Sequence, residues 1–205
     1  MRKFLFDIDG TLVDSSAVVE RVWREVAAEF GADADVILAH CHGRLDTDIV
    51  GEFFRPETAG AALLMVSSLE SAALDGVVAM EGARELLAAL APGDWAAVTS
   101  GPRQLMTGRL RVSGLPVPAV FVTADDVSAG KPDPQGFLIA AAALGAPPGA
   151  CVVVEDSPAG IAAGKAAGAL VVGVTSTHRR DALTAADVII GGLPELLGVL
   201  PDAPA

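Results

Sequence analysis

Short runs of apolar residues recur along the chain, and most of them show no alternation between apolar and polar positions. Such runs are typical of strands in a parallel sheet, because helices cover both faces of that sheet. The pattern therefore predicts a series of short buried strands. They span residues 4–6, 95–98, 119–122, 151–154, 170–174 and 188–190.

Stretches with apolar residues at helical spacing lie between the later runs, at residues 81–91, 133–145 and 156–168. The last two have the same design, in which a capping residue precedes a proline and a glycine closes the stretch. These residues are Asp133, Pro134 and Gly145, and then Ser157, Pro158 and Gly168. The alternation predicts an α/β fold with a Rossmann-like parallel sheet and right-handed crossovers.

Residues 15–80 have a different pattern, with no convincing strand. A helix is expected over residues 17–30, where apolar side chains share one face. Those side chains are Val18, Val19, Val22, Trp23, Val26 and Phe30. Further helices are expected at 47–54 and 58–73. Because this insertion is far longer than a crossover needs, we expect an α-helical cap at 15–80, a hinge near 13–15, and a core formed by 1–14 and 81–205.

Charge and composition indicate which kinds of partner the protein binds and where in the cell it is located. The formal net charge of −12 disfavours nucleic acid, because phosphate backbones require clustered Lys and Arg. No apolar run reaches the roughly 18 residues of a membrane span. The first apolar run stops at Asp7, too early for a signal peptide. Cys41 and Cys151 form no CxxC pair, so we expect a reduced, cytoplasmic location.

Two carboxylates follow the first apolar run directly, in the stretch "FLFDIDGTLVDS". Asp7 and Asp9 are two positions apart on an extended chain, so both side chains can face one site. Gly10 then lets the backbone turn tightly. Two like charges ~4 Å apart repel by about 4 kcal/mol at an effective dielectric of 20. We therefore expect a cation or a shared proton beside this pair.

Four motifs in order carry a family resemblance. The first is "DIDGT", and it is followed by "AAVTSG" with Thr99, "GKPDP" with Lys131, and "VVVEDSPAG" with Glu155 and Asp156. Together they resemble the haloacid dehalogenase-like superfamily over the whole chain, including a helical cap after the first motif. The motifs look most like those of its small sugar-phosphate and polyol-phosphate phosphatases.

The resemblance implies phosphoryl transfer to an aspartate and hydrolysis of the resulting aspartyl phosphate. Asp7 would be the nucleophile, held in line with phosphorus. Asp9 would protonate the leaving oxygen and then deprotonate the attacking water. Lys131 would stabilise charge on the phosphoryl group and orient Asp7.

The same resemblance assigns phosphate-binding groups. Thr99 would donate a hydrogen bond to a phosphoryl oxygen. Ser100 and Gly101 are expected to open the following helix, and their N–H groups would also donate to the phosphoryl oxygens. Gly10 and Thr11 would complete the first loop near the phosphate.

Counting charges predicts a metal cofactor. A phosphate monoester brings about −2 near neutral pH. Asp7, Glu155 and Asp156 add three more negative charges, which Lys131 alone cannot offset. A hard divalent cation with oxygen ligands, Mg²⁺, is therefore expected. By resemblance its ligands would be Asp7, the Asp9 backbone carbonyl and Asp156, with Glu155 in a direct or water-mediated supporting role.

The cap should select a small phosphorylated metabolite. Its polar cluster "HCHGRLDTD" offers His42, Arg44, Asp46 and Thr47 as substrate contacts, although a solvated loop would have the same composition. A metal site at His40, Cys41 and His42 is not expected, because neighbouring residues rarely converge on one ion.

Other activities of the superfamily fit less well. Its dehalogenases typically have an aromatic residue where Asp9 stands. Its phosphonatases need a cap lysine, whereas the lysines of this chain are Lys3, Lys131 and Lys165. A β-phosphoglucomutase-like mutase stays open as an alternative, although Thr11 favours a phosphatase. A catalytically silent binding relative is a further alternative, but no motif residue is missing. Oligomeric state is not predicted.

Overall fold

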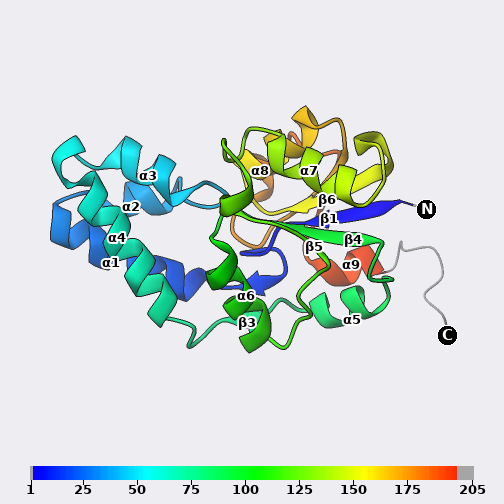
Figure 1. Ribbon diagram of the computed structural model, residues 1–205, viewed down its shortest axis with the longest axis horizontal. Helices are drawn as coiled ribbons and strands as arrows, with labels where there is room; N and C mark the ends of the chain where they lie inside the picture. The colour runs from blue at the N-terminus through cyan, green and yellow to red at the C-terminus, as the bar shows by residue number, and fades with distance from the viewer. Residues whose placement is uncertain (1, 198–205) are drawn as a thin grey trace.

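A computed structural model describes residues 2–197 and contains a six-stranded parallel sheet in the order β5-β4-β1-β6-β7-β8. The strands are β1 (Lys3–Phe6), β4 (Trp95–Val98), β5 (Val120–Val122), β6 (Cys151–Glu155), β7 (Leu170–Val174) and β8 (Val188–Ile190). Each predicted strand is present, so the α/β fold expected from the apolar runs is confirmed (Figure 1).

Helices cover both faces of this sheet, which explains why the strands carry no polar face. On one side lie α7 (Gln135–Ala143) and α8 (Pro158–Ala166), and on the other lie α5 (Ala83–Ala88), α6 (Arg103–Val112) and α9 (Leu193–Leu197) (Figure 1). The 3₁₀ turns are η1 (Ala124–Asp126), η2 (Pro148–Ala150) and η3 (Arg180–Leu183).

Alternate residues of β1 enter opposite halves of the core. Leu5 packs in the cluster of α7 and α8, which contains Phe137 and Ile161. Phe4 and Phe6 pack in the other cluster, on the side of α5, α6 and α9. Phe4, Leu5 and Phe6 are therefore all apolar, because the strand has two buried faces.

The predicted cap of α8 is confirmed, whereas the predicted starts of α7 and α6 differ from those in the structure. Ser157 caps α8, since its Oγ accepts from the Gly160 N–H at 3.1 Å. In α7, Pro134 occupies the cap position, and Asp133 accepts from the Gln135 N–H at 2.9 Å. The expectation that residues 100 and 101 open a helix is wrong, because α6 begins at Arg103, after Pro102. A proline fits best at a helix start, and here it marks the start.

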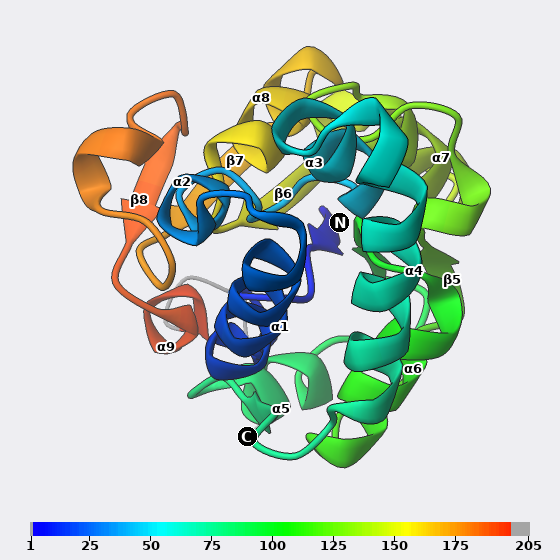
Figure 2. The same ribbon diagram turned by 90° about the vertical axis from the view of Figure 1, so that its left-hand side faces the viewer.

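Four helices that follow β1 and β2 (Val13–Asp14) in the chain form a helical lobe beyond the carboxyl edge of the sheet (Figures 1 and 2). Its helices are α1 (Ser16–Phe30), α2 (Ala34–Leu38), α3 (Asp46–Phe53) and α4 (Pro56–Ala72). The expected inserted helical cap is confirmed, although α2 was not predicted. The amphipathic face of α1 is buried at Val18, Val22, Trp23 and Val26.

The expectation that the insertion contains no strand is wrong. A two-residue strand, β3 (Val78–Ala79), pairs antiparallel with β2 (Val13–Asp14). The two segments that join the lobe to the core therefore run side by side. The domain boundaries drawn from the sequence stay a prediction.

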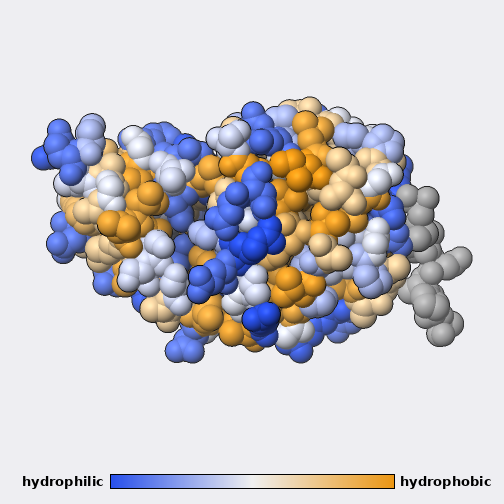
Figure 3. Space-filling model, viewed as in Figure 1, coloured by the Kyte–Doolittle hydropathy of each residue, from blue (hydrophilic) through white to orange (hydrophobic). Residues whose placement is uncertain are grey.

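The surface seen in Figure 3 mixes hydrophobic and hydrophilic residues across both lobes. No helix within residues 2–197 combines the length and the apolar composition needed to cross a bilayer.

Truncating a core side chain tests the two-faced packing of the sheet. Ile161 is fully buried between α8 and the sheet. We expect Ile161→Ala to lower the free energy of unfolding by about 2–4 kcal/mol in urea denaturation, because it leaves a cavity. Leu64→Ala is the control, since Leu64 is 75% exposed on α4, and it should change stability by less than about 0.5 kcal/mol. A cost below about 1 kcal/mol for Ile161→Ala would contradict this packing.

Candidate active site

Three carboxylates meet where β1 and β6 end. The two strands are parallel neighbours with Phe6 opposite Val154, so the residue after β1, Asp7, lies beside Glu155 at the end of β6. Asp7, Glu155 and Asp156 are buried, and each offers a carboxylate oxygen within 4.8 Å of the others. Hard oxygen donors in this arrangement could hold a divalent cation.

A single buried ammonium faces this group. Lys131 Nζ donates to Asp7 Oδ1 at 2.5 Å, to Glu155 Oε1 at 2.5 Å and to the Val98 carbonyl at 3.2 Å. Burial lowers the pKa of Lys131, but the two carboxylates outweigh it and the net shift is upward. Burial also raises the pKa of Asp7, against the opposing effect of Lys131. One ammonium therefore leaves the three carboxylates under-compensated, which fits a site for an added cation.

Glu155 is already saturated by protein donors. Its Oε1 accepts from Lys131, and its Oε2 accepts from the N–H groups of Asp156 and Ser157 and from Ser157 Oγ, at 3.0 to 3.2 Å. Glycine is required at position 160, where any Cβ would collide with the Glu155 carboxylate. Glu155 is thus fixed as a scaffold for Lys131 and the following loop.

Two hydroxyl groups orient the Asp156 carboxylate. Thr177 Oγ1 donates to its Oδ2 and Thr11 Oγ1 to its Oδ1, the latter at 3.4 Å. Burial and the neighbouring Glu155 raise the pKa of Asp156 to about 7. Gly10, with φ of +83°, leaves room for this contact, since a Cβ there would lie 2.7 Å from Thr177 Cγ2.

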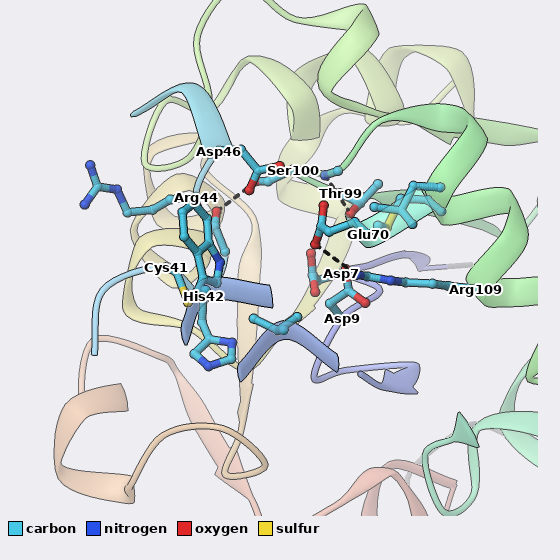
Figure 4. Close-up of a pocket in the computed structure, with 16 residues that line it drawn as sticks. Asp7, Asp9, Cys41, His42, Arg44, Asp46, Glu70, Thr99, Ser100 and Arg109 are labelled. Atoms are coloured by element: carbon cyan, nitrogen blue, oxygen red, sulfur yellow. Dashed lines mark hydrogen bonds and ion pairs between the residues drawn. The ribbon is translucent and has the colours of Figure 1, made fainter. Parts of the chain in front are cut away.

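Asp9 follows the same strand but has different partners. Its Oδ1 accepts from Ser15 Oγ at 2.7 Å, and its Oδ2 accepts from Arg109 Nη1 at 2.6 Å. Arg109 Nη2 also donates to Glu70 Oε1 at 3.0 Å. Figure 4 shows the guanidinium directed at both carboxylates. The two carboxylates of the first motif are therefore compensated separately, Asp7 by Lys131 and Asp9 by Arg109.

Thr99, Ser100 and Gly101 form the turn between β4 and α6 and line the pocket above Asp7. Thr99 Oγ1 accepts from the Gly101 N–H at 3.3 Å. Ser100 Oγ donates to the Gly43 carbonyl of the cap at 2.9 Å. The Ser100 hydroxyl is therefore engaged with the cap loop.

That cap loop rests closely on the core. Gly43 has φ of +76°, and a Cβ there would lie 2.8 Å from Ser157 Cβ. Next to Gly43, the His42 ring packs edge-on against the His178 ring of the core, with the ring centroids 5.7 Å apart. These contacts hold the cap loop against the core, and residues 41–44 line the same pocket as Asp7 and Asp9.

A pocket that opens to solvent lies between cap and core. Of the predicted cap contacts, His42, Arg44 and Asp46 line it (Figure 4). Thr47 is exposed and is not among the lining residues. The Arg44 guanidinium pairs with Glu52 at 2.7 Å. Val19, Trp23, Leu105 and Met106 add apolar walls, so the pocket combines a polar floor with apolar sides.

Comparison with known proteins identifies the family. Residues 1–168 match the family of haloacid dehalogenase-like hydrolases. Hexitol phosphatase A of Escherichia coli (strain K12) is 38% identical over 198 residues, which cover 94% of this chain and 92% of the relative. This chain belongs to the haloacid dehalogenase-like hydrolases. The resemblance drawn from the four motifs is thereby confirmed.

Further relatives agree with this assignment. The 2-deoxyglucose-6-phosphate phosphatase 1 of Saccharomyces cerevisiae (strain ATCC 204508 / S288c) is 32% identical over 94% of this chain and 88% of its own length. Among solved structures, a hydrolase from Pseudomonas syringae has a TM-score of 0.88 at 29% identity and covers 97% of both chains. The hydrolase fold therefore extends through both core and cap.

Arg109, Glu70 and Thr177 were not predicted from the sequence of this hydrolase. A signal did exist for the first two. Glu70 continues the buried stripe of α4 one turn after Val66, and Arg109 continues that of α6 one turn after Leu105. A charged residue in an apolar stripe predicts a buried partner, but the pattern does not say which. Thr177 follows β7 without any local motif.

Removing the Asp46 charge should have a pH-dependent effect on stability. Burial and Glu70 raise the pKa of Asp46 to about 7, from an ordinary value of 3.8. Between these values the folded state retains a proton that the unfolded state has lost, so stability falls as pH rises from about 4 to about 7. We expect Asp46→Asn to gain about 1–3 kcal/mol at pH 8 and clearly less at pH 5, measured by urea denaturation.

Asp48→Asn is the matched control, because Asp48 is exposed on the same helix. It should change stability little at either pH. A gain for Asp46→Asn that is equal at pH 5 and pH 8 would contradict the assignment of the effect to Asp46 ionisation.

Proposed function

We propose that this hydrolase is a Mg²⁺-dependent phosphatase, which releases phosphate from a small sugar or polyol phosphate through an aspartyl phosphate on Asp7. The observation that carries the proposal is the buried trio of Asp7, Glu155 and Asp156 with Lys131, in which Asp7 also lines the pocket between cap and core. The names of relatives that match over most of the chain point to the same chemistry.

Asp7 acts as the nucleophile in this proposal. The 2.5 Å contact with Lys131 restricts one carboxylate oxygen and leaves the other to attack phosphorus. Asp7, Asp156 and the Asp9 carbonyl would hold Mg²⁺, and Glu155 would support them. When bound, the cation neutralises charge on the phosphoryl oxygens and thereby lowers the barrier to attack by an anionic carboxylate.

Asp9 serves as general acid and then as general base. Its carboxyl would donate a proton to the leaving alkoxide oxygen, and its carboxylate would take one from the attacking water. Thr99 Oγ1 and the N–H groups of Ser100 and Gly101 would donate to phosphoryl oxygens. Lys131 would add positive charge near the same phosphoryl oxygens.

The pocket chemistry favours a leaving group with hydroxyls and no second phosphate. Asp46 and Glu70 are carboxylates in the cap wall. Carboxyl groups accept hydrogen bonds from hydroxyls, and neither of these two supplies the positive charge that a second phosphate would need. A mutase must hold a sugar bisphosphate as its intermediate, which this wall disfavours. The non-enzymatic alternative has no support, since each motif residue is present. A cytoplasmic location stays a prediction.

The nucleophile is tested by Asp7→Asn. The amide cannot attack phosphorus, so phosphate release should fall by about 10³-fold or more, with the circular dichroism spectrum unchanged. Asp14→Asn is the control, because Asp14 is an exposed aspartate just after the same loop. Substantial turnover by Asp7→Asn would refute the role of Asp7.

A substrate panel with controlled metal tests the proposed reaction. Hexitol phosphates, 2-deoxyglucose 6-phosphate, glycerol phosphate, fructose 1,6-bisphosphate and β-glucose 1-phosphate are each assayed for phosphate release and for isomerised product. We expect release from one or more monophosphates, weak activity on the bisphosphate, loss of activity with chelator, and recovery with Mg²⁺. Metal-independent hydrolysis would refute the cofactor assignment, and conversion of β-glucose 1-phosphate to glucose 6-phosphate would favour the mutase.

A further inference from the structure

Arg109 joins the core to the cap through two carboxylates. It lies on α6 and is only 2% exposed. One terminal nitrogen pairs with Asp9 in the core, at 2.6 Å, and the other pairs with Glu70 near the end of cap helix α4, at 3.0 Å. Among the ion pairs within residues 2–197, Arg109–Glu70 is the one that connects a cap helix to the core.

Fold stability alone accounts poorly for this residue. Removing a guanidinium from water is costly, and a buried ion pair seldom stabilises a fold more than apolar residues of the same volume would. Within the described part of the chain, the Arg109 Nε–H is buried without a hydrogen-bond partner, which adds to the cost. An arrangement that costs stability at the wall of the pocket is better explained by the chemistry there.

The geometry fixes both oxygens of Asp9. Ser15 Oγ holds Oδ1, and Ser15 directly precedes α1, the first cap helix. Arg109 holds Oδ2 and is itself held by Glu70 of α4, the last cap helix. The orientation of Asp9 therefore depends on the helices at both ends of the cap.

We propose that Arg109 is a positioning residue that orients the Asp9 carboxyl toward the leaving-group oxygen and, through Glu70, ties this orientation to the cap lying over the core. The inference rests on the proposed function, in which Asp9 is the general acid. It assigns Arg109 no contact with the phosphoryl group. Its effect reaches the reaction through Asp9.

This role has a consequence that a purely structural ion pair lacks. A sugar alkoxide is a poor leaving group and needs the proton that Asp9 donates, whereas 4-nitrophenolate leaves readily without one. The ratio kcat/KM reports on steps up to departure of the leaving group. Loss of Asp9 alignment should therefore lower kcat/KM strongly for an alkyl phosphate and weakly for an aryl phosphate.

The test compares sorbitol 6-phosphate with 4-nitrophenyl phosphate in the presence of Mg²⁺. Arg109→Lys keeps the charge but replaces the two-pronged donor with a point charge. We expect its kcat/KM to fall about 10- to 100-fold for sorbitol 6-phosphate and less than about 3-fold for 4-nitrophenyl phosphate. Arg111→Lys is the matched control on an exposed position of the same helix, and should leave both values unchanged.

Glu70→Gln provides a second variant that retains the Arg109–Asp9 pair. We expect a smaller loss with the same preference for the alkyl substrate. The double variant should be little worse than Arg109→Lys alone, because both changes act on one link. If Arg109→Lys does not fold, as judged by circular dichroism, Glu70→Gln alone decides through its substrate preference.

Equal losses on the two substrates, or additive losses in the double variant, would overturn the positioning role and leave a structural ion pair. That result differs from failure of the proposed function, in which the unaltered protein itself would show no Mg²⁺-dependent release from either ester.

Discussion

The repulsion among Asp7, Glu155 and Asp156 is the interaction on which the rest of the site depends. Three carboxylates are held within 4.8 Å of one another in a buried position, and Lys131 supplies one compensating charge. A parallel sheet produces this arrangement directly, because neighbouring strands deliver the residues that follow them to one edge. The shortfall of positive charge is the physical reason why we propose a divalent cation at this site.

The surrounding groups compensate the charge of each carboxylate in a different way. Glu155 is saturated by Lys131 and by backbone and hydroxyl donors, so its charge is satisfied within the protein. The side chain of Asp156 accepts from two hydroxyls, those of Thr11 and Thr177. Asp9 is served by a different cation, Arg109. Asp7 and Asp9 therefore have different cationic partners although they are two residues apart, which is consistent with the different roles that we propose for them. The partner of Asp9, Arg109, also contacts Glu70 of the cap.

The sequence was sufficient for the elements that have a strong local signal. Strands such as β1 and β6 were predicted because both of their faces are buried, and the motif residues at their ends followed from chain order. The short elements α2 and β3 were missed because a few residues carry too little periodicity. Arg109 and Glu70 were missed because they lie 39 positions apart in the chain, on two different helices, and no local pattern specifies such a partner. The start of α6 was expected at Ser100 and Gly101, but the helix begins at Arg103, directly after Pro102.

We propose that Asp7 carries the phosphoryl group between substrate and water, and the other roles proposed for the site depend on this step. It can be observed by mass spectrometry of the protein after acid quenching during turnover of a sugar phosphate with Mg²⁺. A phosphorylated peptide whose modified residue is Asp7 is expected. Phosphate on another residue, or no phosphorylated peptide at any quench time while phosphate is being released, would contradict it.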